Sequence, residues 1–368
     1  MKIAVRVDSS NIIGTGHVMR CLSLVNQLTT MHSASAHFFC RNNVGAILDA
    51  IAKRRHSVQK MLKGRSTVEG LGLAHGAWLG ASQTEDAQEF LSLVGKELFD
   101  LLIVDHYGID RRWEKLVRDS DCFRRVLVID DLVDREHQCD FLLDQTYDRT
   151  EDEYRPLVNE ACELLLGSDY CLLRPEFAVP LKKIESCRNG VDFNNLKVLV
   201  MFGGTDPENL TGRVIEVLLK QNWIKSVDVV LGSSAEHKGK IQALCARDKM
   251  FKLHVGSNSV AEIMLDNDLA IGAAGVTSWE RAAMGLPSLV IVQAENQKMI
   301  ANKLNDAGII QLINQADLTQ QLNLCRERWL PNQIAYNQVV RRCVNICDGK
   351  GTERVCRILN KQPAEIIF

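Results

Sequence analysis

Two glycines and a histidine lie close together in residues 12–20, which read IIGTGHVMR. Gly14 and Gly16 carry no side chain, so they leave backbone amides open to a ligand. A histidine in the first turn of a helix meets the positive end of the helix dipole, which favours a neutral imidazole. A histidine bonded only to its own loop is the alternative. The two glycines and the place after an apolar run favour His17 as a base that activates water.

This loop does not match the familiar nucleotide-binding signatures. It lacks the third glycine of G-x-G-x-x-G, and residues 37–43, HFFCRNN, offer no acidic side chain for a ribose. The Gly-Lys-Ser/Thr of a phosphate-binding loop is absent as well. The sequence therefore argues against a dinucleotide or ATP site of these two kinds.

Polar residues also follow the apolar run in residues 101–110, LLIVDHYGID. Asp105 either orients a histidine or caps the turn, and His106 follows it at the same strand end. Tyr107 either contacts a sugar or is an incidentally exposed aromatic ring. The two aspartates that end residues 126–131, VLVIDD, fit sugar binding and strand termination equally well. We include Asp105, His106 and Tyr107 among the candidate site residues.

Glycine turns recur in the second half of the chain. Residues 197–211, KVLVMFGGTDPENLT, predict a strand, a turn and then a helix that begins near the Asp-Pro pair at 206–207. Amides at such a turn suit phosphate oxygens, although an ordinary strand-to-helix turn is the alternative. The candidate substrate-binding residues here are Gly203, Gly204 and Thr205.

A longer pattern covers residues 268–297, DLAIGAAGVTSWERAAMGLPSLVIVQAENQ. Thr277 and Ser278 are candidate helix caps, and Glu280 is expected in the first turn, where the dipole favours a carboxylate that accepts two ribose hydroxyls. A Gly-Leu-Pro turn then precedes a strand that ends at the ENQ triplet. The candidate substrate-binding residues of this stretch are Gly275, Thr277, Ser278, Glu280, Asn296 and Gln297.

The elements that must position these residues alternate along the whole chain. Short apolar runs followed by amphipathic stretches are typical of parallel strands joined by helices. The expected strands are 3–7, 37–40, 101–105, 126–130, 197–204, 227–232, 268–273 and 287–292. Helical spacing after the first strand is shown by Val18, Leu22, Val25 and Leu28. Ligands are expected at the carboxyl ends of the strands, in a cleft between two halves.

At 368 residues the chain exceeds the size of most single cores, so we expect two doubly wound α/β domains. Residues 1–180 are predicted to form an N-terminal sugar and catalytic domain, and residues 196–345 a nucleotide-binding domain. The polar residues 181–195 are the expected linker. Residues 346–368 are expected to form a helix that packs back on the first domain.

Composition and charge exclude several classes of protein. Lys and Arg number 44 against 46 Asp and Glu, and a net charge of −2 gives no basic field for nucleic acid. The first ten residues are too polar for a signal peptide, and no run approaches the roughly 18 apolar residues of a membrane span. None of the 12 cysteines forms a C-x-x-C pair, so no metal site is expected. We expect a cytoplasmic monomer without stable membrane insertion.

The motif TSWERAAMGLP at 277–287, followed by ENQ, resembles the nucleotide half of sugar-nucleotide enzymes of the GT-B architecture, which include the transferase that makes lipid II from UDP-N-acetylglucosamine. Three further segments narrow the match: RVDSSNIIGTGHVMRC (6–21), IVDHYGID (103–110) and FGGTD (202–206). Over roughly residues 1–310 the chain resembles the UDP-2,4-diacetamido-2,4,6-trideoxy-beta-L-altropyranose hydrolase family of pseudaminic acid biosynthesis.

This resemblance implies a GT-B fold of two Rossmann-like domains that face a cleft. It implies hydrolysis of a UDP-linked diacetamido deoxy sugar without a metal ion or cofactor, with inversion at the anomeric carbon. His17 would be the base, Tyr107 would assist at the sugar, and Asp8 would position His17 or the sugar. The residues implied to hold the nucleotide are Thr277, Ser278 and Glu280, with Asn296 and Gln297 near the phosphates or the sugar.

Three other functions compete with this interpretation. In a transferase of the same architecture, the histidine would activate an acceptor hydroxyl. The basic amphipathic residues 47–63 would then be the candidate for contact with anionic lipid, although a solvated helix face is the favoured alternative. A sugar-nucleotide binding module without turnover is the second, although it would have no need of His17 and Tyr107. A hydrolysing 2-epimerase is the third. We assign no chemistry to residues 311–368.

Overall fold

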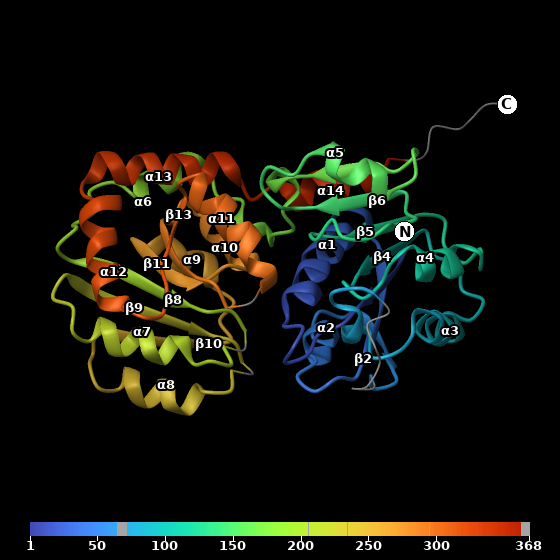
Figure 1. Cartoon of the computed structure of the whole chain (residues 1–368), viewed down its shortest axis with the longest axis horizontal. Helices are drawn as coiled ribbons and strands as arrows, with labels where there is room; N and C mark the ends of the chain where they lie inside the picture. Colours follow the sequence, from blue (N-terminus) through green and yellow to red (C-terminus); the bar gives the residue numbers. More distant parts are fainter. Residues whose placement is uncertain (65–71, 205, 234, 294, 362–368) are drawn as a thin grey trace. The chain divides into compact units, whose positions relative to one another are not determined.

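The structure, a computed structural model, describes residues 1–64, 72–204, 206–233, 235–293 and 295–361. Its internal contacts divide the chain into two units. The first unit consists of Met1–Arg174 together with the stretch that begins at Gly351, and the second unit is Pro175–Lys350. Each unit holds one parallel sheet with helices packed against it (Figure 1).

The boundary between the units lies ahead of the predicted linker. The chain passes from the first unit to the second at Arg174 and Pro175, so residues 181–195 are part of the second unit. The first of them form helix α6 (Leu181–Cys187), in which Ile184 is buried. The polar residues of this stretch therefore belong in part to the exposed side of α6 and in part to the turn that follows it and leads to β8.

In its described part, the sheet of the first unit has seven parallel strands in the order β3-β2-β1-β4-β5-β6-β7. The strands are β1 (Lys2–Val7), β2 (Ser35–Arg41), β3 (Ser57–Met61), β4 (Leu101–Asp105), β5 (Val126–Ile129), β6 (Phe141–Asp144) and β7 (Glu163–Leu166). The helices are α1 (Gly16–His32), α2 (Leu48–Ala52), α3 (Gln83–Val94), α4 (Arg111–Arg118), α5 (Glu151–Tyr154) and α14 (Gly351–Leu359). The four strands predicted for this half are confirmed, and β3, β6 and β7 lie toward the sheet edges.

Both faces of this sheet are covered, which explains why its central strands read as continuous apolar runs. Along β1, Ile3 and Val5 join one buried cluster, whereas Ala4 joins the cluster on the opposite face. The first cluster includes the predicted apolar positions of α1, which are all buried: Val18, Leu22, Val25 and Leu28. Helix α14 adds three residues to the same cluster: Val355, Cys356 and Leu359.

The described part of the second unit has a six-stranded parallel sheet in the order β10-β9-β8-β11-β12-β13. Its strands are β8 (Leu196–Met201), β9 (Ile224–Leu231), β10 (Phe251–Val255), β11 (Leu269–Ala273), β12 (Ser288–Ile291) and β13 (Ile310–Leu312). Besides α6, its helices are α7 (Leu210–Leu218), α8 (Lys238–Cys245), α9 (Val260–Asp266), α10 (Val276–Ala283), α11 (Lys298–Asp306), α12 (Leu318–Leu324) and α13 (Gln333–Ile346). The four strands predicted for this half are confirmed. Within the described ranges, no helix combines the length and apolarity needed to cross a bilayer.

Helix α7 begins later than predicted. We expected it near the Asp-Pro pair at 206–207, but its first residue is Leu210. The carboxylate of Asp206 instead accepts hydrogen bonds from the amides of Leu210 and Thr211, each at 2.9 Å. Asp206 therefore satisfies amides that the helix itself leaves unpaired, and it does so from four residues ahead.

Gly285 ends α10 in a left-handed conformation, with φ of 55°. A Cβ atom at this position would lie 2.7 Å from Cγ2 of Ile184 and 3.0 Å from Cγ1 of Val340. The glycine therefore does two things at once, because it allows the turn and lets α6 and α13 pack against it.

We expect Gly285→Ala to lower the free energy of unfolding of the second unit by about 2 kcal/mol, because it adds backbone strain and overpacking. Urea unfolding followed by circular dichroism measures this loss. Gly239→Ala is the matched control, since Gly239 lies in α8 and a Cβ added there would meet no neighbouring atom of the described residues within 4 Å. Equal stability of the two variants would contradict the packing argument.

Candidate active site

His17 and Asp105 form a hydrogen-bonded pair at the carboxyl ends of two adjacent strands. β1 and β4 pair in parallel with Val7 opposite Asp105, so the start of α1 lies next to the end of β4. Nδ1 of His17 is 2.6 Å from Oδ1 of Asp105. Burial by itself raises the pKa of Asp105, but the charge of Arg20 and the hydrogen bonds from Arg20 and His17 hold it well below its usual range. Asp105 is thus an ionised acceptor, Nδ1 carries the ring proton, and Nε2 is the basic nitrogen.

Arg20 holds this pair from the next turn of α1. Its Nε and Nη2 atoms donate to the two carboxylate oxygens of Asp105, each at 2.7 Å. Its Nη1 atom donates to Oδ2 of Asp131 at 2.5 Å. Arg20 is almost fully buried. A fixed planar guanidinium therefore sets the positions of two carboxylates that come from different strand ends.

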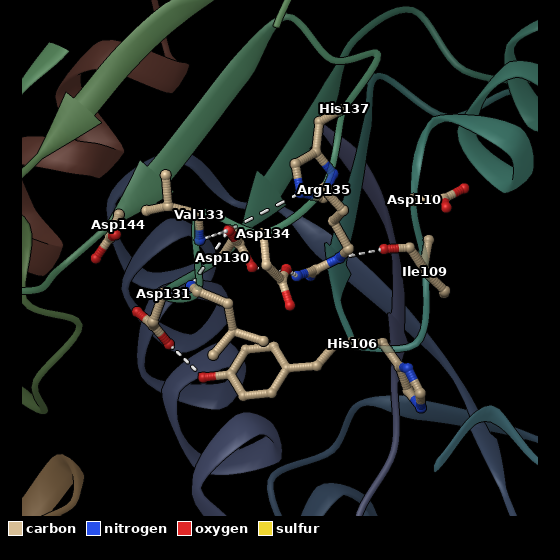
Figure 2. A network of polar contacts seen from close by, with 12 residues as sticks. His106, Ile109, Asp110, Asp130, Asp131, Val133, Asp134, Arg135, His137 and Asp144 are labelled. Atoms are coloured by element: carbon tan, nitrogen blue, oxygen red, sulfur yellow. Dashed lines mark hydrogen bonds and ion pairs between the residues drawn. The ribbon is translucent and has the colours of Figure 1, made fainter. Parts of the chain in front are cut away.

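Tyr107 is the second residue fixed by this network. Its hydroxyl donates to Oδ2 of Asp131 at 2.6 Å, the contact drawn from Asp131 in Figure 2. Burial and the charge of Asp131 raise the pKa of Tyr107 well above its usual value, so the phenol keeps its proton. The Tyr107 ring meets the His17 ring edge to face, with centroids 4.6 Å apart. The predicted residues His17, Asp105 and Tyr107 are thus brought together.

A second arginine lies beside the ring of Tyr107. The guanidinium of Arg135 is 5.8 Å from the centre of the Tyr107 ring. Arg135 pairs with Asp130 at 2.8 Å and with Asp134 at 2.7 Å, and its Nε donates to the carbonyl of Ile109 (Figure 2). Of the two aspartates that end the VLVIDD run, Asp131 therefore contacts the site, whereas Asp130 is fully buried behind it.

Two aromatic side chains from the turn before α3 complete the surroundings of His17. Trp78 stacks on Tyr107 with ring centroids 5.9 Å apart, and its ring is 6.5 Å from that of His17. His75 lies 4.4 Å from Trp78, again between ring centroids. Sequence reasoning missed both residues, along with Arg20 and Arg135. Arg20 could have been found, because it lies three residues after His17 on the same helix face.

Asp8 and His106 lie in a buried ionic network beneath the site. Asp8 pairs with Arg6 at 2.8 Å and accepts the amide of Arg41 at 2.7 Å. Nδ1 of His106 accepts the amide of Gly108 at 2.9 Å, so its Nε2 carries the ring proton and faces Asp8 at 3.4 Å. Burial lowers the pKa of His106, which keeps the ring neutral. Asp8 and His106 thus support the turn that carries Tyr107.

The glycine loop ahead of α1 is compact. Gly14 has φ of 80°, and its amide donates to the carbonyl of Ser10 at 2.8 Å. Gly16 is the first residue of α1, and no side chain caps that helix at Thr15. The N-cap residue therefore leaves the amides at the start of α1 available to an anion.

The glycine turn after β8 packs closely against a second loop of the same unit. Gly203 has φ of 84°, and a Cβ at Gly232 would lie 2.3 Å from the carbonyl oxygen of Gly204. Thr205 lies outside the described residues. Gln293, after β12, donates to Asp206 at 3.5 Å and links this turn to the loop that contains the ENQ triplet. Glu295–Gln297 form a 3-10 turn there, which includes Asn296.

The predicted caps of α10 are wrong. The helix begins at Val276 after an N-cap at Gly275, so Thr277 and Ser278 already lie within its first turn. It follows that Glu280 belongs to the next turn. The hydroxyls of Thr277 and Ser278 instead accept hydrogen bonds from a buried arginine of the same helix, at 3.2 and 3.0 Å.

That arginine, Arg281, also donates to the carbonyl of Ala273 at 2.8 Å. Burial lowers the pKa of Arg281 to about 10, so the guanidinium stays charged at neutral pH. A Cβ at Gly272 would lie 2.9 Å from its Nη1 atom. The turn between β11 and α10 therefore has a positive charge directly behind it.

Comparison with solved structures decides the fold. A crystal structure of MurG from Acinetobacter baumannii superposes with a TM-score of 0.65, covering 98% of this chain and all of that one at 14% identity. The chain has the GT-B fold. GT-B proteins consist of two parallel-sheet α/β domains, as predicted from the alternating apolar runs. No protein-family model matches the sequence.

The predicted resemblance in sequence is confirmed as well. The UDP-2,4-diacetamido-2,4,6-trideoxy-beta-L-altropyranose hydrolase of Campylobacter jejuni is 28% identical over 309 residues, which are 84% of this GT-B chain and 97% of that enzyme. An uncharacterized protein of Methanocaldococcus jannaschii is 28% identical over 304 residues. The match covers 81% of this chain but only 57% of the archaeal protein.

Removal of the Arg20 charge should destabilise the first unit. We expect Arg20→Met to lower the free energy of unfolding by about 3 kcal/mol at pH 7, because two carboxylates lose their cation. In the wild type, the depressed pKa of Asp105 keeps its contribution to stability constant above about pH 4. In the variant, burial without the cation raises that pKa above the unfolded value, so the deficit should shrink from pH 7 to pH 5.

Urea unfolding of both proteins at pH 5, 6 and 7 measures this deficit. Arg112→Met is the matched control, because Arg112 pairs with Asp110 while half of its side chain is exposed. That change should cost less than about 1 kcal/mol at every pH. A deficit for Arg20→Met that stays the same at the three pH values would contradict the electrostatic account.

Proposed function

We propose that this protein hydrolyses UDP-2,4-diacetamido-2,4,6-trideoxy-beta-L-altropyranose to UDP and the free sugar. The observation that carries the proposal is the buried Asp105–His17 pair at the start of α1. An ionised Asp105 holds Nδ1 protonated, and that leaves Nε2 to accept a proton. The similarity to the Campylobacter jejuni hydrolase along nearly its whole length supports the choice of substrate.

In the proposed reaction, Nε2 of His17 removes a proton from water as the oxygen attacks the anomeric carbon. The new bond forms on the face opposite the nucleotide, so the configuration inverts as the bond between carbon and phosphate oxygen breaks. UDP leaves with the electron pair of that bond. The carboxylate of Asp105 stabilises the imidazolium that forms on His17. Tyr107, whose proton is held by Asp131, presents its ring and its hydroxyl oxygen to the sugar.

The second unit is proposed to bind the nucleotide. Backbone amides at the Gly203–Gly204 turn and at the start of α10 would receive phosphate oxygens, and Arg281 adds positive charge behind α10. Glu280 is proposed to accept the ribose hydroxyls, with Asn296 and Gln297 near the phosphates or the sugar, and Thr205 stays a candidate substrate-binding residue. This arrangement offers fixed donors to the charge that develops on UDP. We place this reaction in the cytoplasm and expect a monomer.

A glycosyltransferase is the second candidate, because MurG shares the fold over the whole chain. His17 would then take its proton from an acceptor hydroxyl, with the rest of the site unchanged. The two functions differ in a single observable. A hydrolase consumes the UDP-sugar in water alone, whereas a transferase binds it and leaves it intact until an acceptor is added.

We expect His17→Ala to fold normally and to reduce kcat by about 10²-fold to 10⁴-fold, since the general base is lost. Release of UDP in a coupled assay measures the rate. His254→Ala is the matched control, because His254 forms a similar pair with Asp228 at 2.6 Å in the second unit, outside the proposed site. A near-normal rate for His17→Ala would remove His17 from the mechanism.

An NMR time course in excess EDTA tests the reaction itself. We expect UDP and free sugar to appear together, with the alpha anomer of the sugar formed first, because water attacks opposite the departing UDP. Retention of the beta configuration would argue for a covalent intermediate, and loss of turnover in EDTA would show that a metal ion is needed. Binding without cleavage would favour the transferase.

A further inference from the structure

An aromatic surface beside His17 has no role in the proposed proton transfer and attack by water. It consists of Trp78 and His75, which lie on the turn η1 (Gly76–Leu79) and the residue before it. Trp78 is only half-buried, whereas Trp113 and Trp279 are almost completely buried in the cores. A partly exposed indole next to a candidate base indicates a binding surface, because pockets that bind small molecules are lined mostly by apolar and aromatic side chains.

The position of this aromatic surface is fixed by the fold. Leu79, at the end of η1, is buried in the core. The side-chain oxygen of Gln83 accepts the amides of Asp110 at 3.1 Å and Trp113 at 3.2 Å, which ties the start of α3 to the segment after Tyr107. A Cβ at Gly108 would lie 3.2 Å from the carbonyl oxygen of His75. The turns that carry Trp78 and Tyr107 therefore pass so close to each other that a side chain at Gly108 would be crowded by the backbone of His75.

We infer that Trp78, with His75 beside it, binds the pyranose ring of the substrate through the ring's C–H face. This inference rests on the proposed function, because it assigns the sugar part of that substrate. The face of an indole ring carries partial negative charge, and the C–H bonds of a pyranose are polarised by the neighbouring oxygens, so the two surfaces attract. The substrate sugar has a methyl group at C6 where other hexoses carry a hydroxymethyl group, so it presents more apolar surface to such a ring than those hexoses do.

The sugar is a better occupant than the uracil base. The centroid of Trp78 is 6.5 Å from that of His17, which is proposed to act at the anomeric carbon. The residues proposed to bind the nucleotide all belong to the second unit. Stacking of the sugar on Trp78 also removes bulk water from one side of the reacting carbon, which favours attack by the single water that His17 holds.

Intrinsic fluorescence tests the occupant without turnover. The free product 2,4-diacetamido-2,4,6-trideoxy-L-altrose should change the tryptophan emission of the wild type. UDP alone should cause no emission change that depends on Trp78. The change should vanish in Trp78→Phe and persist in Trp329→Phe, whose indole lies in the second unit. If UDP alone changed the emission of Trp78, the uracil base would stack on that indole and the inference would be wrong. The inference would also be wrong if neither the free sugar nor UDP changed the emission of Trp78.

Kinetics with the UDP-sugar give the second readout. Trp78→Ala should raise KM about 10-fold with kcat within a few-fold of the wild type, and Trp78→Phe should recover most of the loss because it restores an aromatic face. An unchanged KM in Trp78→Ala, with an active wild type, would overturn the role of Trp78. An inactive wild type that still shows the sugar-dependent fluorescence change would refute the proposed function and leave the sugar-binding surface standing.

Discussion

The buried charge of Arg20 is the interaction on which the first unit depends. A guanidinium that is removed from water must have its donors satisfied in good geometry, by carboxylates here, because the cost of desolvation otherwise exceeds the attraction. Arg20 meets this condition with Asp105 and Asp131, at 2.5 to 2.7 Å. Asp105 ends β4 and Asp131 follows β5. Both carboxylates can pair with Arg20 only if α1 is held in one position relative to the ends of these two strands. The orientation of His17 and the hydrogen bond of Tyr107 both follow from that position.

A second buried network repeats this logic one layer deeper. Arg6 pairs with Asp8 and Asp86, and Arg41 pairs with Asp86 as well. Because Arg6 lies on β1 and Asp86 on α3, this network joins the sheet to the helix that follows η1. The reactive groups are therefore supported by fixed charges, which do not relax as an apolar core does. Such support favours catalysis, because the site is already organised before the substrate arrives.

The fold was largely readable from the sequence, since central parallel strands are apolar on both faces and appear as continuous runs. Edge strands such as β3 (SVQKM) and β13 (IQL) are too polar or too short to stand out. The site was only partly readable. His17 was marked by its glycines, but a buried arginine such as Arg20 looks like any exposed helical residue until its partners are known. Trp78 comes from a turn without a motif, and its proximity to His17 arises only from the tertiary fold. Thr277 and Ser278 were misjudged as caps because α10 already begins at Val276, and their hydroxyls accept hydrogen bonds from Arg281 instead.

The contribution of α14 to the first core has a consequence for the order in which the chain acquires structure. Val355 and Leu359 fill the same cluster as Ile3 and Val25, although the whole second unit separates them in sequence. During synthesis, nearly all of the second unit leaves the ribosome before these residues do. The first unit, whose strands are made first, must wait with part of one face of its sheet uncovered, although α1 already packs on that face. Closure over so long an insertion costs little more than closure over a short one, since the entropy of a loop grows only with the logarithm of its length. The core of the unit that bears the candidate catalytic residues therefore stays incomplete until α14 has been made.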